Sequence, residues 1–390
     1  MNDRHLQGWC RVLAVLWIAA VIVVSIQATV HHNNNFEIFR TAWRNLSAGH
    51  DLYAANPNHF DFFKYSPTFA LLFAPFAVVP FGVGVFLWNA LNAGSLYWSL
   101  GRVLTTEQAL AARAIVFLDT VGSMQNVQSN ALSAGLMILA FADLQRRQEL
   151  RAAFAVVAGA LIKIFPIAAA AFAIFRPYRL PRFAIYCVGI GIALLAAPLV
   201  VLSPAELAEQ YRSWGAIQKS DALTRGYSVM GQLEVWFGVA WPNWPVQLLG
   251  AAVLIAPLTR LSSWGQSRFR LLFLASVLMF CVLFNHKAES PTFVVALAGV
   301  AIWLVLSPRT RGWWVTFAVV IVGTVLSSSD AMPEVLQEGL FEPYRLKTLP
   351  VLLVWVMTQL DLWERAERKE HQTASAPLPT LESGGPAPAT

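Results

Sequence analysis

The sequence predicts an all-α, polytopic transmembrane protein with about ten spanning helices and additional re-entrant segments. Composition is the first reason: 57% of the 390 residues are hydrophobic and 13% are charged, whereas a soluble domain carries roughly 25% charged residues. The second is the uninterrupted apolar character of stretches such as Leu13–Val24 and Phe183–Leu202, because about 20 such residues cross the hydrocarbon core as a helix. The third is the 15 tryptophans, which suit the interfacial belts of membrane proteins.

The apolar stretches place the spanning helices along the chain. They are expected at 9–30, 81–103, 109–123, 128–144, 181–202, 246–264, 270–286, 290–306, 313–328 and 348–363. The first is too long for the apolar region of a signal peptide and lacks a small-residue cleavage pattern, which favours a signal anchor. Residues 1–363 are expected to form one membrane domain, and 364–390, rich in Pro, Ala, Ser, Thr and Gly, a disordered cytoplasmic tail.

Two further apolar stretches, 66–79 and 151–175, are expected to be re-entrant. Arginines flank the second stretch on both sides, at Arg146, Arg147, Arg151, Arg176, Arg179 and Arg182. Both of its ends should therefore lie on the same side of the membrane. Lys163 and Pro166 would lie near the apex, because proline removes a backbone donor and interrupts a helix. A single span of about 25 residues is the alternative.

Charge distribution sets the expected orientation. With both termini cytoplasmic, the inner segments carry about twice as many Lys and Arg as the outer ones, in agreement with the positive-inside rule. The net charge of +6 comes from short arginine clusters between apolar spans, which argues against a nucleic-acid-binding face. The polar chemistry is expected on the extracytoplasmic side.

Several candidate residues lie in the first outer segment, 31–65. Residues 36–43 are expected to form an amphipathic helix on the membrane surface. Glu37 and Arg40 lie one turn apart on it, either as an ion pair or with Glu37 as a general base. Asp61 beside Lys64 offers a site for a sugar hydroxyl and a phosphate, and Tyr65 is interpreted as an interfacial anchor.

Amide side chains form a second group, where one predicted helix ends outside and the next begins. Gln125, Gln128 and Asn130 lie close to the apolar boundary, where unpaired amides are costly. Either this segment caps the two helices, with Ser129 or Asn126 as the N-cap, or it lines a polar pocket. Amides suit sugar hydroxyls because each both donates and accepts. Both interpretations remain open.

Lys163 lies between two isoleucines in the apolar hairpin, so its ammonium group needs an anion or a route to water. Asp119 and a ligand phosphate are the candidates for that anion.

The densest ionisable group is the tight outer turn with His286, Lys287 and Glu289. Lys287 supplies a charge for a lipid phosphate, and Glu289 is either its partner or a base, while a solvated turn is the alternative. Arg225 and Tyr227 offer a less specific anion and hydroxyl site.

Metal and cofactor chemistry is not indicated. The histidines do not have the spacing of a structural metal site, and no HExxH or paired CxxC pattern occurs. The three cysteines fall at or inside predicted helices and are interpreted as small core residues. The sequence also has no P-loop, no Rossmann glycine pattern and no nucleophile elbow. We therefore expect no cofactor and no metal.

In their order along the chain, these features resemble glycosyltransferase family 87, the polyprenol-phosphate-mannose-dependent mannosyltransferase-like proteins of the GT-C superfamily. The matching stretches are FEIFRTAWRNLSAGHDLY, YSPTFALLFAPFAVVP with LWNALNAG, QNVQSNAL, ALIKIFP and FNHKAESPTF. The resemblance covers most of residues 30–310. Each motif alone is modest, but five in register make coincidence improbable.

The resemblance implies a GT-C enzyme of the cell inner (plasma) membrane that moves a hexose from a polyprenyl-phosphate-sugar donor to a lipid or glycan acceptor. It implies a site on the outer face and no nucleotide or metal. Members commonly place an acidic residue just before the position matched by Phe36, where this sequence has Asn35. Glu37 or Asp61 would have to replace that acid.

The implied mechanism is inverting. A carboxylate deprotonates the acceptor hydroxyl, which attacks the anomeric carbon as the lipid phosphate leaves, and cationic side chains such as Lys163 and Lys287 stabilise the leaving phosphate. The candidate bases are Glu37, Asp61 and Glu289. The residues expected to bind substrate are Asn35, Arg40, Lys64, Tyr65, Gln125, Gln128, Asn130, Lys163, Arg225, Tyr227, His286 and Lys287.

Two other functions remain as alternatives. A transporter or flippase of polyprenyl-linked sugars would share the broken helices and the intramembrane lysine, although such proteins often show two related halves and none is detectable here. A catalytically silent envelope-assembly protein is the other alternative, which Asn35 makes possible.

Overall fold

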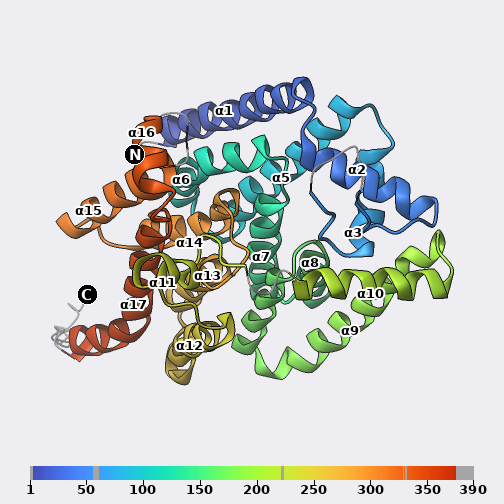
Figure 1. The fold of residues 1–390 in the computed structure, drawn as a ribbon. Helices are drawn as coiled ribbons and strands as arrows, with labels where there is room; N and C mark the ends of the chain where they lie inside the picture. Colours follow the sequence, from blue (N-terminus) through green and yellow to red (C-terminus); the bar gives the residue numbers. More distant parts are fainter. Residues whose placement is uncertain (1–2, 56–60, 221–223, 328, 330–331, 375–390) are drawn as a thin grey trace, which may run out of the picture.

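The computed structural model describes residues 3–55, 61–220, 224–327, 329 and 332–374. Within these ranges the chain forms helices and no strand (Figure 1). The predicted all-α class is confirmed.

Each stretch expected to span the membrane contains one α-helix. These helices are α1 (Asp3–Val30), α5 (Phe81–Val103), α6 (Thr106–Gln125), α7 (Asn130–Gln145), α9 (Leu180–Ala196), α12 (Asn243–Ile255), α13 (Ser267–Leu283), α14 (Phe293–Leu306), α15 (Arg311–Val320) and α17 (Thr348–Ala374). Helix α17 continues past the predicted end of the span at 363, so residues 364–374 of the predicted disordered tail are helical. The rest of that tail lies outside the described residues.

Seven further α-helices lie between these in the described ranges. They are α2 (Asn34–Ser47), α3 (Pro67–Leu72), α4 (Ala74–Ala77), α8 (Glu149–Ile162), α10 (Pro204–Ser220), α11 (Val229–Phe237) and α16 (Glu334–Leu336). The stretch 66–79 is therefore two short helices, divided at Phe73. Pro67 begins the first of them, as proline at a first helical position does, and the Ser66 side chain caps it by accepting from the Phe69 N–H.

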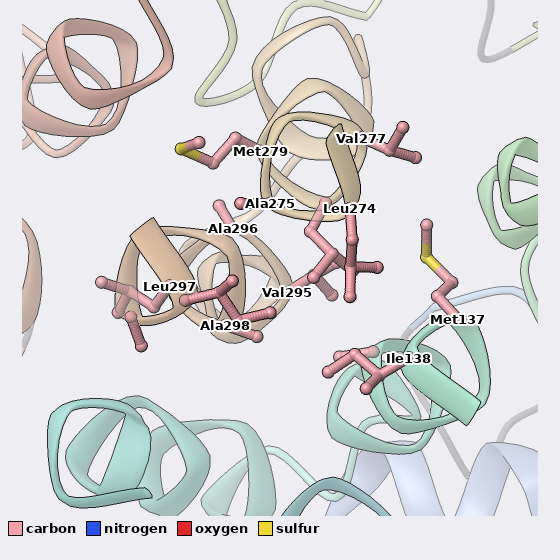
Figure 2. Close-up of a cluster of buried hydrophobic side chains, with 14 of the residues drawn as sticks. Met137, Ile138, Leu274, Ala275, Val277, Met279, Val295, Ala296, Leu297 and Ala298 are labelled. Atoms are coloured by element: carbon pink, nitrogen blue, oxygen red, sulfur yellow. The ribbon is translucent and has the colours of Figure 1, made fainter. Parts of the chain in front are cut away.

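Helices α7, α13 and α14 lie in the middle of the molecule (Figure 1). Figure 2 shows side chains from all three gathered between them, among them the fully buried Ile138, Leu274 and Val295. Gly299 of α14 allows its helix to approach α13 closely, since an added Cβ would lie 2.5 Å from the Ala275 carbonyl oxygen. This rigid core fixes the end of α13 and the start of α14 relative to the start of α7.

The peripheral helices expose large apolar side chains. Ile185 of α9, for example, has 69% of its surface exposed. Others are Val15, Ile18 and Ile26 on α1, Val188 and Ile192 on α9, and Leu248 and Leu249 on α12. In the part of the chain that is described, two helical segments, Asp3–Val30 and Pro177–Val200, are long and apolar enough to cross a membrane.

The stretch 151–175 turns back on itself, as its arginine flanks predicted. Helix α8 ends at Ile162, Lys163 has an extended backbone, and Phe165–Phe175 returns as the 3-10 helix η1. The far ends of the two arms meet, because Arg179 Nη1 lies 2.6 Å from Glu149 Oε1. Along η1 the buried side chains include Pro166, Ala169, Phe172 and Phe175, at the three-residue spacing that a 3-10 helix places on one face.

The helices share two ends, which we name the arginine end and the amide end. At the arginine end Arg146 Nη2 donates to the Arg102 carbonyl oxygen at 2.7 Å, close to the arms of the hairpin. At the amide end the turn 125–130 joins α6 to α7, and Asn33 Nδ2 donates to the Gln125 carbonyl oxygen at 3.0 Å. Gln128, Asn130, Lys163 and Glu289, four of the predicted site residues, lie at the amide end.

Candidate functional site

A chain of hydrogen bonds at the amide end joins three distant parts of the sequence. Gln128 Nε2 donates to Glu289 Oε2 at 2.8 Å, and Gln128 Oε1 accepts from Asn130 Nδ2 at 2.6 Å. Asn130 Oδ1 in turn accepts from Lys163 Nζ at 2.6 Å. We call these four residues the carboxylate–lysine chain. It links an acid to a cation through two amides.

The turn that carries Gln128 is a strained piece of backbone. Val127 has φ of 49°, in the left-handed region that a β-branched residue rarely occupies. Trp88 of α5 holds it there, since Trp88 Nε1 donates to the Val127 carbonyl oxygen at 3.1 Å. Strain of this kind costs about 1–3 kcal/mol and is concentrated at functional sites. Ser129 occupies the N-cap position of α7 without a side-chain capping hydrogen bond, whereas Asn126 Nδ2 donates to the Gly122 carbonyl oxygen at 2.9 Å, at the end of α6.

Tyr65 lies beside this turn with its side chain partly buried. Burial raises the pKa of its phenol well above the ordinary value, an effect that the neighbouring Ser129 side chain opposes and the negative charge of Glu289 reinforces. The phenol therefore stays protonated, so it is available as a hydrogen-bond donor next to the carboxylate. The backbone oxygen of Tyr65 accepts from the Tyr53 hydroxyl at 2.8 Å, which fixes this segment.

The turn with Glu289 is held by the backbone of a second segment. Gly226 N–H donates to the His286 carbonyl oxygen at 2.8 Å, and Tyr227 N–H donates to the Ala288 carbonyl oxygen at 2.7 Å. Only glycine fits at position 226, since an added Cβ would lie 2.1 Å from the Ala288 oxygen. The Tyr227 ring packs edge-on against Phe293.

Lys287 reaches from the same turn toward the first outer segment. Its Nζ donates to Gln218 Oε1 at 3.0 Å, and Gln218 Nε2 donates to the Lys64 carbonyl oxygen at 2.9 Å. Gln218 of α10 thus connects the two candidate lysines. Lys64 Nζ itself lies 3.1 Å from Asp61 Oδ1 in a partly exposed ion pair.

Glu37 forms ion pairs outside the carboxylate–lysine chain, and the predicted ion pair with Arg40 is wrong. The one-turn ion pair with Arg40 does not form, because Arg40 Nε donates to the Ala77 carbonyl oxygen at 3.1 Å. Glu37 instead lies 3.2 Å from Arg44 and 3.6 Å from His32. None of its hydrogen bonds or ion pairs within the described ranges reaches the carboxylate–lysine chain.

Asn35 has a structural contact. Its Nδ2 donates to the Asn126 carbonyl oxygen at 2.8 Å, next to the bond between Asn33 and Gln125. A carboxylate at this position would have no proton to donate there. The amide therefore serves to attach the start of α2 to the α6–α7 turn.

Three further expectations have separate outcomes. Arg225 pairs with Glu234 at 2.7 Å and donates to two backbone oxygens, so its charge is used within its own loop. His286 Nδ1 lies 3.5 Å from Gln247 Nε2. Asp119 does not pair with Lys163, because it lies 3.2 Å from Lys347 Nζ.

In the ranges that the structure covers, no group of three or more His, Cys, Asp and Glu side chains is arranged to hold a metal ion. The polar groups of the carboxylate–lysine chain are two amides, one ammonium group and one carboxylate. Such a set is suited to a ligand with hydroxyl groups and a negative charge.

The sequence profile of glycosyltransferase family 87 matches residues 62–285, more than half of the chain. The chain belongs to glycosyltransferase family 87. A comparison with curated proteins gives no match.

Membership in family 87 indicates that the chain transfers a sugar from a donor to an acceptor. The matched residues include Tyr65, the amide turn and Lys163, and so three of the four residues of the carboxylate–lysine chain. They stop just before the turn with Glu289, and they begin after α2.

Sequence reasoning missed two polar residues at or near this candidate site. Gln218 lies in α10, where one glutamine among other polar residues carries no special signal. Lys347 precedes the last long helix and was indistinguishable from a flanking charge. Their partners, Lys287 and Asp119, are 69 and 228 residues away (287 − 218 and 347 − 119).

Proposed function

We propose that this family 87 protein is a membrane hexosyltransferase. It would move a hexose, mannose-like, from a polyprenyl-phosphate donor to an extracytoplasmic lipid or glycan acceptor with inversion. The observation that carries the proposal is the carboxylate–lysine chain: a carboxylate and an ammonium group held at one end of the helical core by Gln128 and Asn130.

The membrane placement is supported by the exposed apolar side chains of α1, α9 and α12. Exposing such apolar faces to water is unfavourable and promotes aggregation, whereas lipid chains cover them favourably. Arg102, Arg146 and Arg179 lie together at the arginine end, which by the positive-inside rule would face the cytoplasm. The amide end would then face outward in the inner (plasma) membrane.

Both termini would lie on the cytoplasmic side. Thr29, near the end of α1, lies against Gly82 at the start of α5, and α5 runs from there to Arg102 at the arginine end. Helix α1 therefore starts at the arginine end. The last helix, α17, reaches the same end, where Arg260 donates to the Trp363 carbonyl oxygen.

In this proposal Glu289 takes the proton of the acceptor hydroxyl. The acceptor oxygen forms a bond to the anomeric carbon, the bond from that carbon to the phosphate oxygen breaks, and its electron pair leaves with the phosphate. Lys163 and Lys287 would stabilise the charge that develops on the phosphate, which is usually the larger contribution to catalysis. The amides of Gln128 and Asn130 would orient sugar hydroxyls.

Glu289 is a better candidate base than the other two acids. Glu37 is held between Arg44 and His32, and Asp61 is an exposed partner of Lys64. Glu289 instead is bonded to a neutral amide and lies close enough to Lys163 and Tyr65 for its charge to affect both. A general base must lie close to the reacting hydroxyl, and Glu289 is linked through Gln128 and Asn130 to Lys163, which would bind the leaving phosphate.

The decisive experiment is sugar transfer in proteoliposomes with a polyprenyl-phosphate hexose and the Glu289→Gln variant. Glutamine keeps the hydrogen bond from Gln128 and removes only the basic oxygen, so we expect kcat to fall by about 10²–10⁴-fold. Glu209→Gln, an exposed acid of α10 paired with Arg212, is the matched control and should retain wild-type rates.

Full activity of Glu289→Gln, Glu37→Gln and Asp61→Asn would remove the base hypothesis. Donor binding by the wild-type protein without any turnover would instead support a transporter, a flippase or a silent envelope-assembly protein. That result would refute the enzymatic proposal itself.

A further inference from the structure

Lys347 is a buried cation on the far side of the Glu289 turn. Its Nζ donates to Ser290 Oγ at 3.0 Å, lies 3.2 Å from Asp119 Oδ1 and sits 5.2 Å from the centre of the Phe293 ring. The Lys347 and Asp119 side chains are each only 5% exposed. A lysine from the end of the chain thus contacts the residue that follows the candidate base.

The Lys347 backbone is itself anchored. Thr324 Oγ1 donates to the Lys347 carbonyl oxygen at 3.1 Å. Two residues earlier, Arg345 Nη1 donates to the Gly226 carbonyl oxygen at 3.1 Å, next to the backbone pairing that holds His286. The segment 345–347 therefore contacts both Gly226, whose backbone pairs with the Glu289 turn, and Ser290 within that turn.

Stability alone is a poor explanation for this ion pair. Removing two charges from water is expensive, and a buried ion pair is often no more stabilising than an apolar pair of the same volume. Asp119 Oδ2 has no hydrogen-bond partner within the described ranges, so Lys347 is the main offset to the Asp119 charge. The pair instead fixes the position of the Lys347 ammonium group. Asp119 belongs to helix α6 and holds that group within hydrogen-bonding distance of Ser290.

We propose that Lys347, held by Asp119, is a positioning residue that sets the place of the Glu289 carboxylate through Ser290. Its catalytic consequence rests on the proposed role of Glu289 as the base. Ser290 begins the short 3-10 turn η7 (Ser290–Thr292), and Glu289 N–H donates to Thr292 Oγ1 at 3.3 Å. A shift of Ser290 would therefore carry Glu289 with it, away from Gln128.

The test uses two variants that leave no charge unpaired. Ser290→Ala removes the hydroxyl that Lys347 contacts and keeps the ion pair. Asp119→Asn with Lys347→Met removes both charges together. Ser290→Thr, which keeps a hydroxyl, is the conservative variant. Glu149→Gln with Arg179→Met removes a partly buried ion pair at the arginine end and is the control.

Two readouts are measured on the full-length protein in proteoliposomes. Hydrogen exchange should become about tenfold faster at the amides of 286–292 in Ser290→Ala and in the Asp119/Lys347 double variant, and stay unchanged there in the arginine-end control. In sugar transfer, kcat should fall by about 10- to 100-fold with KM for donor and acceptor unchanged, since a misplaced base slows the chemical step. Ser290→Thr should restore both.

The outcomes separate this inference from the proposed function. Wild-type exchange at 286–292 in both variants would overturn the positioning role, whatever the activity. Faster exchange without a fall in kcat would show that the pair orders the turn but that Glu289 is not the base. A wild-type protein without transfer would refute the proposed function, while the exchange comparison would still decide whether Lys347 orders the turn.

Discussion

The hydrogen bonds of Gln128 predict a large effect of a nearly isosteric change. Gln128→Met keeps the volume of a side chain that is 9% exposed and deletes both of its bonds, to Glu289 and to Asn130. The bond to a charged acceptor is worth about 1.5–3 kcal/mol and the neutral one about 0.5–1.5 kcal/mol. Together they amount to roughly 2–4.5 kcal/mol.

If the whole loss is expressed in the transition state, kcat/KM falls by about 30- to 2000-fold, at 1.36 kcal/mol per factor of ten. The assay is the initial rate of sugar transfer in proteoliposomes. Gln145→Met, at the other end of α7, is the control, because both polar atoms of Gln145 are buried without a described hydrogen-bond partner. A Gln128→Met enzyme within threefold of the wild type would refute the reasoning.

Asn35→Asp should weaken the attachment of α2 by about 1–3 kcal/mol, because a carboxylate would face the backbone oxygen that the amide now meets; chemical denaturation measures it, and unchanged stability would contradict the contact. Gly226→Ala should lower transfer at least about tenfold, since its Cβ would meet the Ala288 oxygen at 2.1 Å and displace the Glu289 turn. Gly215→Ala, with nothing within 4 Å of the new Cβ, is its control and should be active. Glu37→Gln should cost about 1 kcal/mol of stability, through its partly exposed arginine partner, and leave the transfer rate within about threefold; a rate loss like that of the Glu289 variant would reverse the assignment of the base.

Helix positions followed from the sequence because apolar length is a local property. The range 81–103 coincides with α5, and the arginines on both sides of 151–175 predicted a hairpin that the Arg179–Glu149 contact confirms. The type of helix was not always predicted correctly. Residues 246–264 were expected to form one helix, but α12 ends at Ile255 and 3-10 turns follow it. Proline at 257 supplies the break.

Pairing between polar residues could not be predicted in the same way. The QNVQSNAL stretch indicated a pocket or a cap with equal force, and neither interpretation could name Glu289, 161 residues later, as the partner of Gln128. Asp119 and Lys163 are both charged residues in apolar stretches, so the sequence predicted that they could form an ion pair. The packing of α17 against the core instead brings Lys347 to Asp119, a choice that depends on tertiary structure.

The return arm of the hairpin determines how far Lys163 projects. Helix α8 has 14 residues and would be about 21 Å long, while the 11 residues of η1 cover about 22 Å because a 3-10 helix rises about 2 Å per residue. As an α-helix, η1 would measure only about 16 Å. An α-helical return arm would therefore be about 5 Å shorter, roughly one helical turn. The 3-10 conformation of η1 thus lets the return arm match the length of α8, at whose end Lys163 lies.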